Sequence, residues 1–186
     1  AKDGEEFKVG KLTFRVLHTP GHTMESTCYL LLDENGKETA LFSGDTLFIG
    51  DVGRPDLAQK AAHLTQEQLA ETLFDSLRNK VMTLPDDVIV YPAHGAGSAC
   101  GKNMSKETFD TLGHQKATNY ALRANMTKAE FVKEVTTGLM PPPAYFLASA
   151  TLGEPREFAA QLCGQPASSF QHVADEGATQ VAVVPA

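Results

Sequence analysis

Two histidines and one aspartate each follow a short apolar segment and sit among small residues. They are His22 in the segment 19–23 (Thr-Pro-Gly-His-Thr), Asp45 in 43–46 (Ser-Gly-Asp-Thr) and His94 in 91–95 (Tyr-Pro-Ala-His-Gly). Each side chain follows a predicted strand, where ligands from separate loops can converge on a rigid sheet. Imidazole and carboxylate groups are ligands of zinc and of non-haem iron. The three segments therefore predict a metal centre with His22, Asp45 and His94 as its ligands.

The spacing of the histidines limits this prediction. A centre of this kind usually also has a His-x-His pair, and no two histidines of this sequence lie two residues apart. The closest pair, His18 and His22, are four residues apart. Two or three protein ligands are too few to hold a metal ion tightly.

The predicted elements that carry these residues are short strands followed by helices. Apolar alternation predicts a strand pair over 7–16 with a turn at Gly10-Lys11, and the runs 28–32, 39–42 and 88–91 read as strands. The segment 33–36 (Asp-Glu-Asn-Gly) is typical of a hairpin turn. A loop is expected over 44–55, before the first predicted helix.

Helices are predicted where leucines recur at four-residue spacing or where a capping pattern begins. We expect them over 65–79, 105–122, 127–137 and, more briefly, 155–162. Thr65 with Gln68, and Thr127 with Glu130, have the spacing of capping boxes. Three prolines at 141–143 mark a boundary. We therefore predict one domain over 1–140 and a Pro-rich linker and tail of uncertain structure over 141–186.

Composition excludes several classes of protein. The chain has 186 residues and a net charge of −7 without a Lys/Arg cluster, so we expect neither a nucleic-acid partner nor an anionic membrane surface. Its apolar runs are too short to span a bilayer. Cys28, Cys100 and Cys163 are odd in number and far apart, which does not indicate a disulfide framework. We therefore expect a reducing, cytoplasmic location.

Three longer segments carry a family resemblance. The segments 44–57, 91–102 and 115–120 resemble the metallo-β-lactamase superfamily, in its thiol-handling branch of glyoxalase II and the persulfide dioxygenases, and the latter most closely. The resemblance implies an α/β (α+β) fold, a mixed sheet flanked by helices. It also implies that the chain is the C-terminal half of an αβ/βα sandwich, without the family's first metal motif, His-x-His-x-Asp-His. The implied partner is the missing N-terminal half or a second copy of the chain.

The resemblance implies two alternative chemistries. In persulfide dioxygenases one Fe(II) is held by two histidines and a carboxylate; His22 and Asp45 match two of these ligands, with His94 beside the metal. In glyoxalase II two Zn(II) ions use all the motifs; Asp45 would bridge them and His94 would complete the second site. We predict oxidation of glutathione persulfide by oxygen to sulfite, with thioester hydrolysis as the alternative. Because the chain lacks the first metal motif, we expect it to be inactive alone on either chemistry. A non-catalytic half that binds a partner chain is the alternative of another class.

Four further residues are candidates for the small-molecule thiol substrate. Arg54 could lie at the mouth of the site and bind the substrate's carboxylates, with a catalytic role beside His94. Alternatively Arg54 could pair with Asp56 or Asp51 and hold the loop in place. The resemblance places Lys116 and Asn119 with Arg54 and Asp56 as substrate-binding candidates, although a role in a helix surface or cap is equally compatible with their positions.

The segment 95–102 imitates a phosphate-binding loop, since it follows a strand and ends in Gly-Lys. Its first glycine is replaced by Ala96 and the magnesium-binding hydroxyl by Asn103, which argues against a nucleotide. We expect instead a flexible loop over the thiol pocket, with Cys100 as a packed or slightly exposed thiol.

Overall fold

The computed structural model describes residues 2–141, 170–175 and 178–183. Its internal contacts divide the chain into two units, Ala1–Met140 and Pro141–Ala186. The second unit has one described hairpin, in which β9 (Phe170–Asp175) pairs antiparallel with β10 (Ala178–Val183). The helix expected over 155–162 lies outside the described residues. All the candidate site residues belong to the first unit.

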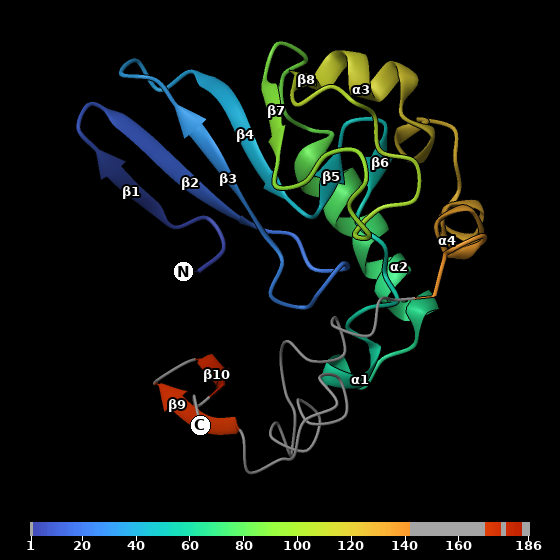
Figure 1. Ribbon diagram of the computed structural model, residues 1–186. Coiled ribbons are helices and arrows are strands. Elements are labelled where there is room, and N and C mark those ends of the chain that lie inside the picture. Colours follow the sequence, from blue (N-terminus) through green and yellow to red (C-terminus); the bar gives the residue numbers. More distant parts are fainter. Residues whose placement is uncertain (1, 142–169, 176–177, 184–186) are drawn as a thin grey trace. The chain divides into compact units, whose positions relative to one another are not determined.

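A mixed six-stranded sheet is the frame of the first unit (Figure 1). In spatial order its strands are β1 (Glu6–Val9), β2 (Leu12–His18), β3 (Thr27–Leu32), β4 (Glu38–Gly44), β7 (Ile89–Pro92) and β8 (Asp110–Thr111). Strands β4 and β7 are parallel, and the other neighbours are antiparallel. Because β2 and β4 both run opposite to β3, the carboxyl ends of β2, β4 and β7 meet at one edge of the sheet. The predicted mixed α/β class is confirmed.

The expected loop over 44–55 contains a small hairpin. Strand β5 (Leu47–Phe48) pairs antiparallel with β6 (Asp51–Val52). The expectation of a plain loop was wrong because Leu47, Phe48 and Val52 are buried in the core, where backbone groups need hydrogen-bond partners.

The helices follow the capping signals more closely than the apolar spacing. They are α1 (Gln59–Ala62), α2 (Gln66–Ser76) with a π-helical turn (Leu77–Val81), α3 (Leu112–Thr118) with a 3-10 turn (Tyr120–Leu122), and α4 (Lys128–Thr136). Both predicted capping boxes are present, at Thr65 and Thr127. The helix predicted over 105–122 was too long, because residues 110–111 join the sheet as β8 and Thr111 caps the helix that follows.

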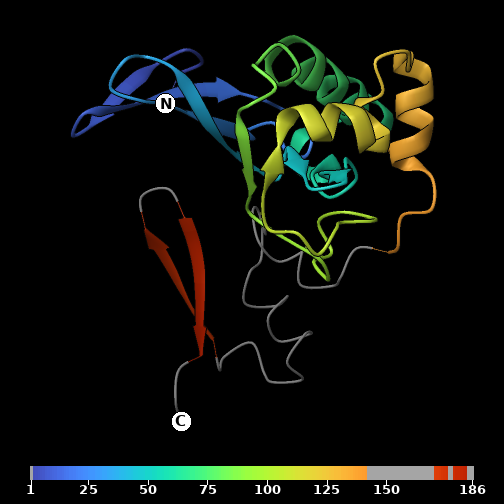
Figure 2. The ribbon, with the colours of Figure 1, turned by 90° about the horizontal axis from the view of Figure 1, so that it is seen from above.

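Helices cover one face of the sheet. Figures 1 and 2 show α2, α3 and α4 on the same side of the strands, and Leu30, Leu41 and Val90 of that face are fully buried. Helices α2 and α4 pack through Phe74 and Phe131, whose ring centroids lie 5.4 Å apart. No helix within residues 2–141 has the length and apolar character needed to cross a membrane.

The opposite face carries a row of aromatic rings, named here the aromatic face. Its members are Phe7, Phe14, Tyr29, Phe42, Tyr91 and Phe109, and each ring has at least one other ring of the face at a centroid distance of 5.4–6.2 Å. Register places the first five on one side of the pleat, since Phe7 pairs with Phe14 and Phe42 pairs with both Tyr29 and Tyr91. Phe42 is 40% exposed and Phe109 56%. A cluster of exposed aromatic side chains on a protein surface marks a packing interface.

Candidate metal centre

The three predicted segments converge at the edge where β2, β4 and β7 end. The hydroxyls of Thr19 and Thr46 lie 2.8 Å apart and join the His22 loop to the Asp45 loop. The backbone N–H of Ala93 donates to the carbonyl of Gly44 at 3.0 Å and joins the His94 loop to the same edge. The parallel pairing of β4 with β7 is what makes the last contact available.

Two glycines allow the loops to approach closely enough. At Gly53 a Cβ would lie 1.9 Å from the carbonyl oxygen of Asp45 and 3.0 Å from the Cβ of His22. At Gly21 a Cβ would lie 2.4 Å from the Cβ of Leu73 on helix α2, and its φ is +144°. A side chain at position 53 would push His22 and Asp45 apart, and one at position 21 would push the His22 loop away from helix α2.

His22 is held as a neutral imidazole with one defined free nitrogen. Its Nδ1 lies 2.9 Å from the carbonyl oxygen of Arg54, which can only accept, so Nδ1 carries the proton. Burial lowers the pKa of His22 below its ordinary value of 6.5. In the neutral ring Nε2 therefore keeps a lone pair, which is the form in which histidine binds metals.

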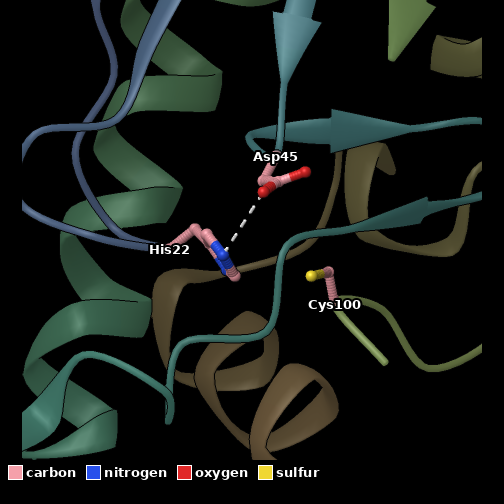
Figure 3. A group of neighbouring side chains, drawn as sticks. All are labelled: His22, Asp45 and Cys100. Atoms are coloured by element: carbon pink, nitrogen blue, oxygen red, sulfur yellow. Dashed lines mark ion pairs between the residues drawn. The ribbon is translucent and has the colours of Figure 1, made fainter. Parts of the chain in front are cut away.

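That free nitrogen faces a carboxylate oxygen. The Nε2 of His22 lies 3.7 Å from the Oδ2 of Asp45 (Figure 3). With His22 neutral both atoms are acceptors, and the separation is too long for a hydrogen bond. A cation about 2.0–2.2 Å from each atom would fit between them.

The thiol of Cys100 completes a three-donor group. The donor atoms of His22, Asp45 and Cys100 all lie within 4.8 Å of one another, and Cys100 is 3% exposed. Burial raises the pKa of the Cys100 thiol. One nitrogen, one oxygen and one sulfur donor suit zinc or a divalent iron and leave further coordination positions open. The described residues therefore fit a single metal ion.

The sequence did not single out Cys100 as a ligand. The only signal was its place in the loop that follows β7, the strand that also delivers His94. Several loop conformations could have kept its thiol away from His22.

His94 contacts Asp45 directly. Its Nδ1 lies 2.6 Å from the Oδ1 of Asp45, the oxygen opposite the one that faces His22. The two imidazoles thus flank one carboxylate, and the His94 side chain is 43% exposed. In this arrangement His94 orients Asp45 and is not among the three converging donors.

Arg54 forms the ion pair with Asp56 that is one of its two predicted roles. It is 4% exposed and forms a two-pronged ion pair with Asp56, in which both N···O distances are 2.6 Å. Its remaining guanidinium hydrogens reach the carbonyls of Ala99 and Met140. All three of its donor nitrogens form hydrogen bonds. The partner that holds the loop is Asp56 and not Asp51. A role of Arg54 and Asp56 in substrate binding stays a prediction.

Lys116 and Asn119, the other two substrate-binding candidates, form hydrogen bonds within the chain. The ammonium of Lys116 donates to the carbonyl of Leu84 and to Asp86, at 2.8 and 2.6 Å. Asn119 is 1% exposed, and its amide donates to the carbonyl of Asp51. These contacts hold the helix region containing both residues against neighbouring loops, and a role of either residue in substrate binding stays a prediction.

Comparisons with known proteins find related chains. The profile of the metallo-beta-lactamase superfamily matches residues 1–94. A probable hydroxyacylglutathione hydrolase of Schizosaccharomyces pombe is 32% identical over 130 residues, 70% of this chain and 46% of that protein. The mitochondrial persulfide dioxygenase of Homo sapiens is 29% identical over 142 residues, 76% of this chain and 47% of that protein.

A solved structure supports the same fold. The metallo-beta-lactamase from Staphylococcus aureus subsp. aureus COL superposes with a TM-score of 0.70 at 38% identity, covering 79% of this chain and 41% of that one. The chain spans less than half the length of the two curated relatives described above.

Proposed function

Because the chain belongs to the metallo-beta-lactamase superfamily, we propose that it carries metal-binding residues of an enzyme that acts on glutathione-type thiols. The proposed reaction is the oxidation of glutathione persulfide by oxygen. One oxygen molecule and one water convert the outer sulfur to sulfite, and glutathione and two protons are released. One relative is named a probable hydroxyacylglutathione hydrolase and another a persulfide dioxygenase; together they support the substrate class but do not separate the two reactions.

The direct contact between His94 and Asp45 favours the dioxygenase. At 2.6 Å the pair is hydrogen-bonded, whereas two ligands of one ion at about 2.1 Å each are normally further apart. A second metal between them would require His94 to move. The three donors His22, Asp45 and Cys100 therefore support a centre with one ion, the arrangement that the resemblance associates with persulfide oxidation.

The proposal gives a defined role to each of four residues, His22, Asp45, His94 and Cys100. His22 presents the lone pair of Nε2 because its Nδ1 proton is already held by the carbonyl of Arg54. Asp45 presents Oδ2 while His94 holds Oδ1 in place. A bound ferrous ion would supply open positions at which oxygen and the persulfide sulfur are brought together. Cys100 adds its sulfur atom to the lining of the metal site.

Metal stoichiometry and reaction type test the proposal together. The purified chain is loaded anaerobically with ferrous iron or with zinc, and bound metal is counted by mass spectrometry. We expect one weakly bound ion per chain. When the chain is assayed together with the N-terminal half of a persulfide dioxygenase, we expect oxygen uptake with glutathione persulfide that requires iron and disappears in Asp45→Asn. Two zinc ions per chain, with hydrolysis of S-lactoylglutathione and no oxygen uptake, would establish the hydrolase instead.

The aromatic face supports a second candidate function, the binding of a partner chain. This face consists of apolar and aromatic side chains from five strands, and Phe7, Tyr29, Phe42 and Tyr91 are 37–43% exposed. Sheets with apolar residues on both sides are normally covered on both sides. We propose that a second apolar sheet packs on it, supplied by a second copy when the chain is alone. Sedimentation velocity tests this: a strictly monomeric chain at high concentration would contradict it.

A further inference from the structure

Asp51 is a buried carboxylate whose oxygens are fully used. It lies in β6 with 0% exposure. Its Oδ1 accepts from the backbone N–H of Val52 at 2.8 Å and from the hydroxyl of Tyr120 at 2.9 Å. Its Oδ2 accepts the backbone N–H groups of Lys102 and Asn103, each at 2.5 Å. A carboxylate this deeply buried is retained only where its hydrogen bonds are satisfied.

Two of these bonds join β6 to the loop that carries Cys100. Lys102 and Asn103 follow that cysteine by two and three residues. At the cysteine and just before it, the carbonyls of the loop accept hydrogen bonds from Arg54. The backbone N–H of Arg54 donates to the carbonyl of Cys100 at 2.9 Å, and the Arg54 guanidinium reaches the carbonyl of Ala99 at 3.3 Å.

A third tie comes from the Lys102 side chain. Its ammonium donates to the carbonyls of Glu134 and Thr137 at the end of α4, at 2.7 and 3.1 Å. The ammonium also lies 5.2 Å from the centroid of the Tyr120 ring. The loop is therefore anchored before, at and after Cys100, and Asp51 provides the two shortest bonds.

We propose that Asp51 is a positioning residue that holds Cys100 beside His22 and Asp45 as the third donor to a divalent ion. The inference rests on the proposed function only in that the same pocket binds the metal. Asp51 acts through the backbone of Lys102 and Asn103 and does not touch the three donor atoms. Without it, the loop retains its ties to Arg54 and that of the Lys102 ammonium, but loses the two backbone bonds that follow the thiol.

The two backbone donors explain why a carboxylate is needed. Asparagine has the same size but only one acceptor oxygen, so one set of donors would face its NH₂ group. The hydroxyl of Tyr120 can accept from that NH₂ group, but backbone N–H groups cannot, so Asp51→Asn removes either the bond to Val52 or those to Lys102 and Asn103. The matched control is Tyr120→Phe, which deletes one donor to Asp51 and leaves both bonds to the loop.

Alkylation of the cysteines measures whether the loop is held. The full chain is treated with N-ethylmaleimide in the presence of a chelator, and the modified peptides are quantified by mass spectrometry. Cys28 is fully buried and reports unfolding of the domain. We expect Asp51→Asn to raise the alkylation rate of Cys100 by at least about tenfold, with that of Cys28 unchanged. Tyr120→Phe should stay within about threefold of wild type.

Three results would overturn the inference. Asp51→Asn could leave the rate at Cys100 unchanged, in which case the other ties suffice. It could raise the rates of Cys28 and Cys100 equally, in which case Asp51 stabilises the whole domain. Tyr120→Phe could expose Cys100 as much as Asp51→Asn does, in which case the bonds to Lys102 and Asn103 are not what holds the loop.

Cobalt absorption tests the donor role without any substrate. The wild-type chain loaded with Co(II) should show a thiolate-to-cobalt charge-transfer band, which Cys100→Ser abolishes and Asp51→Asn loses while cobalt stays bound. A wild-type chain that binds cobalt without this band refutes the donor role. Neither the alkylation nor the cobalt measurement uses a persulfide or a thioester. A chain that shows the band but oxidises no persulfide would therefore contradict only the proposed function.

Discussion

The Nε2 of His22 and the Oδ2 of Asp45 face each other across 3.7 Å without a proton between them. The Nδ1 proton of His22 is held by the carbonyl of Arg54, and the other oxygen of Asp45 is held by His94. Each group is thus fixed from behind and leaves one lone pair directed at the same small space. Backbone and side-chain hydrogen bonds have prepared both donors before any metal arrives.

Loss of either donor should weaken metal binding strongly. We expect His22→Ala and Asp45→Ala each to reduce zinc affinity by at least about a hundredfold, and His94→Ala by about tenfold to a hundredfold, because His94 acts through Asp45. Competition with a chromophoric chelator measures the affinities. His114→Ala, which removes an exposed histidine paired with Asp110, should leave the affinity unchanged. A loss with His94→Ala as large as with His22→Ala would make His94 a ligand.

Burial of neutral His22 should make stability depend on pH. Its pKa is lowered in the folded state, so below the ordinary value of 6.5 the unfolded chain binds a proton that the folded chain refuses. The free energy of unfolding present above pH 6.5 therefore falls as the pH is lowered toward the folded pKa. Urea denaturation at about pH 7.5 and about pH 5.5 measures the change. His22→Gln should show a smaller change than wild type; an equal change would contradict the prediction.

The close approach at Gly53 should not tolerate a methyl group. Gly53→Ala places a Cβ 1.9 Å from the carbonyl of Asp45, so the loops must separate. We expect a loss of stability of about 1–3 kcal/mol together with weaker metal binding. Gly95→Ala is the matched control, because a Cβ there meets nothing within 4 Å. Thermal unfolding compares the two variants, and equal melting temperatures would show that the loop adjusts freely.

The two-pronged geometry of the Arg54 guanidinium, and not its charge alone, should stabilise the fold. Arg54→Lys keeps the positive charge but cannot form the two-pronged pair with Asp56. We expect a loss of about 1–3 kcal/mol in urea denaturation. Arg123→Lys, at the exposed pair with Glu134, should have no measurable effect. If Arg54→Lys raises KM for the thiol substrate without changing stability, Arg54 binds substrate after all.

The aromatic face should govern self-association. Phe42→Glu places a charge in the centre of this face, where the native ring is 40% exposed, so folding should survive while association is lost. We expect sedimentation velocity to show a shift toward monomer. Ala117→Glu adds the same charge to an exposed position of α3 on the other side and should not change the association. Identical behaviour of both variants would exclude this face as the interface.

Much of the fold could be predicted because its signals are local. The hairpin turns, the strands and the capping boxes at Thr65 and Thr127 depend on residues within a few positions of one another. The predictions failed where a long-range contact overrode the local pattern. Residues 110–111 continue the sheet because β7 pairs with them, and the hairpin of β5 and β6 forms because its side chains enter the core.

The sequence by itself determined the chemical types and the strand-end positions of His22, Asp45 and His94, since each follows its own apolar segment. Only the tertiary structure decided which of them converge. Parallel pairing of β4 with β7 brings His94 onto Asp45, and the loop after β7 returns Cys100 to the pocket. Arg54 and Asp51 became internal supports for the same reason: their partners lie 45–86 and 51–69 residues away as well as next to them, and folding alone brings such groups together.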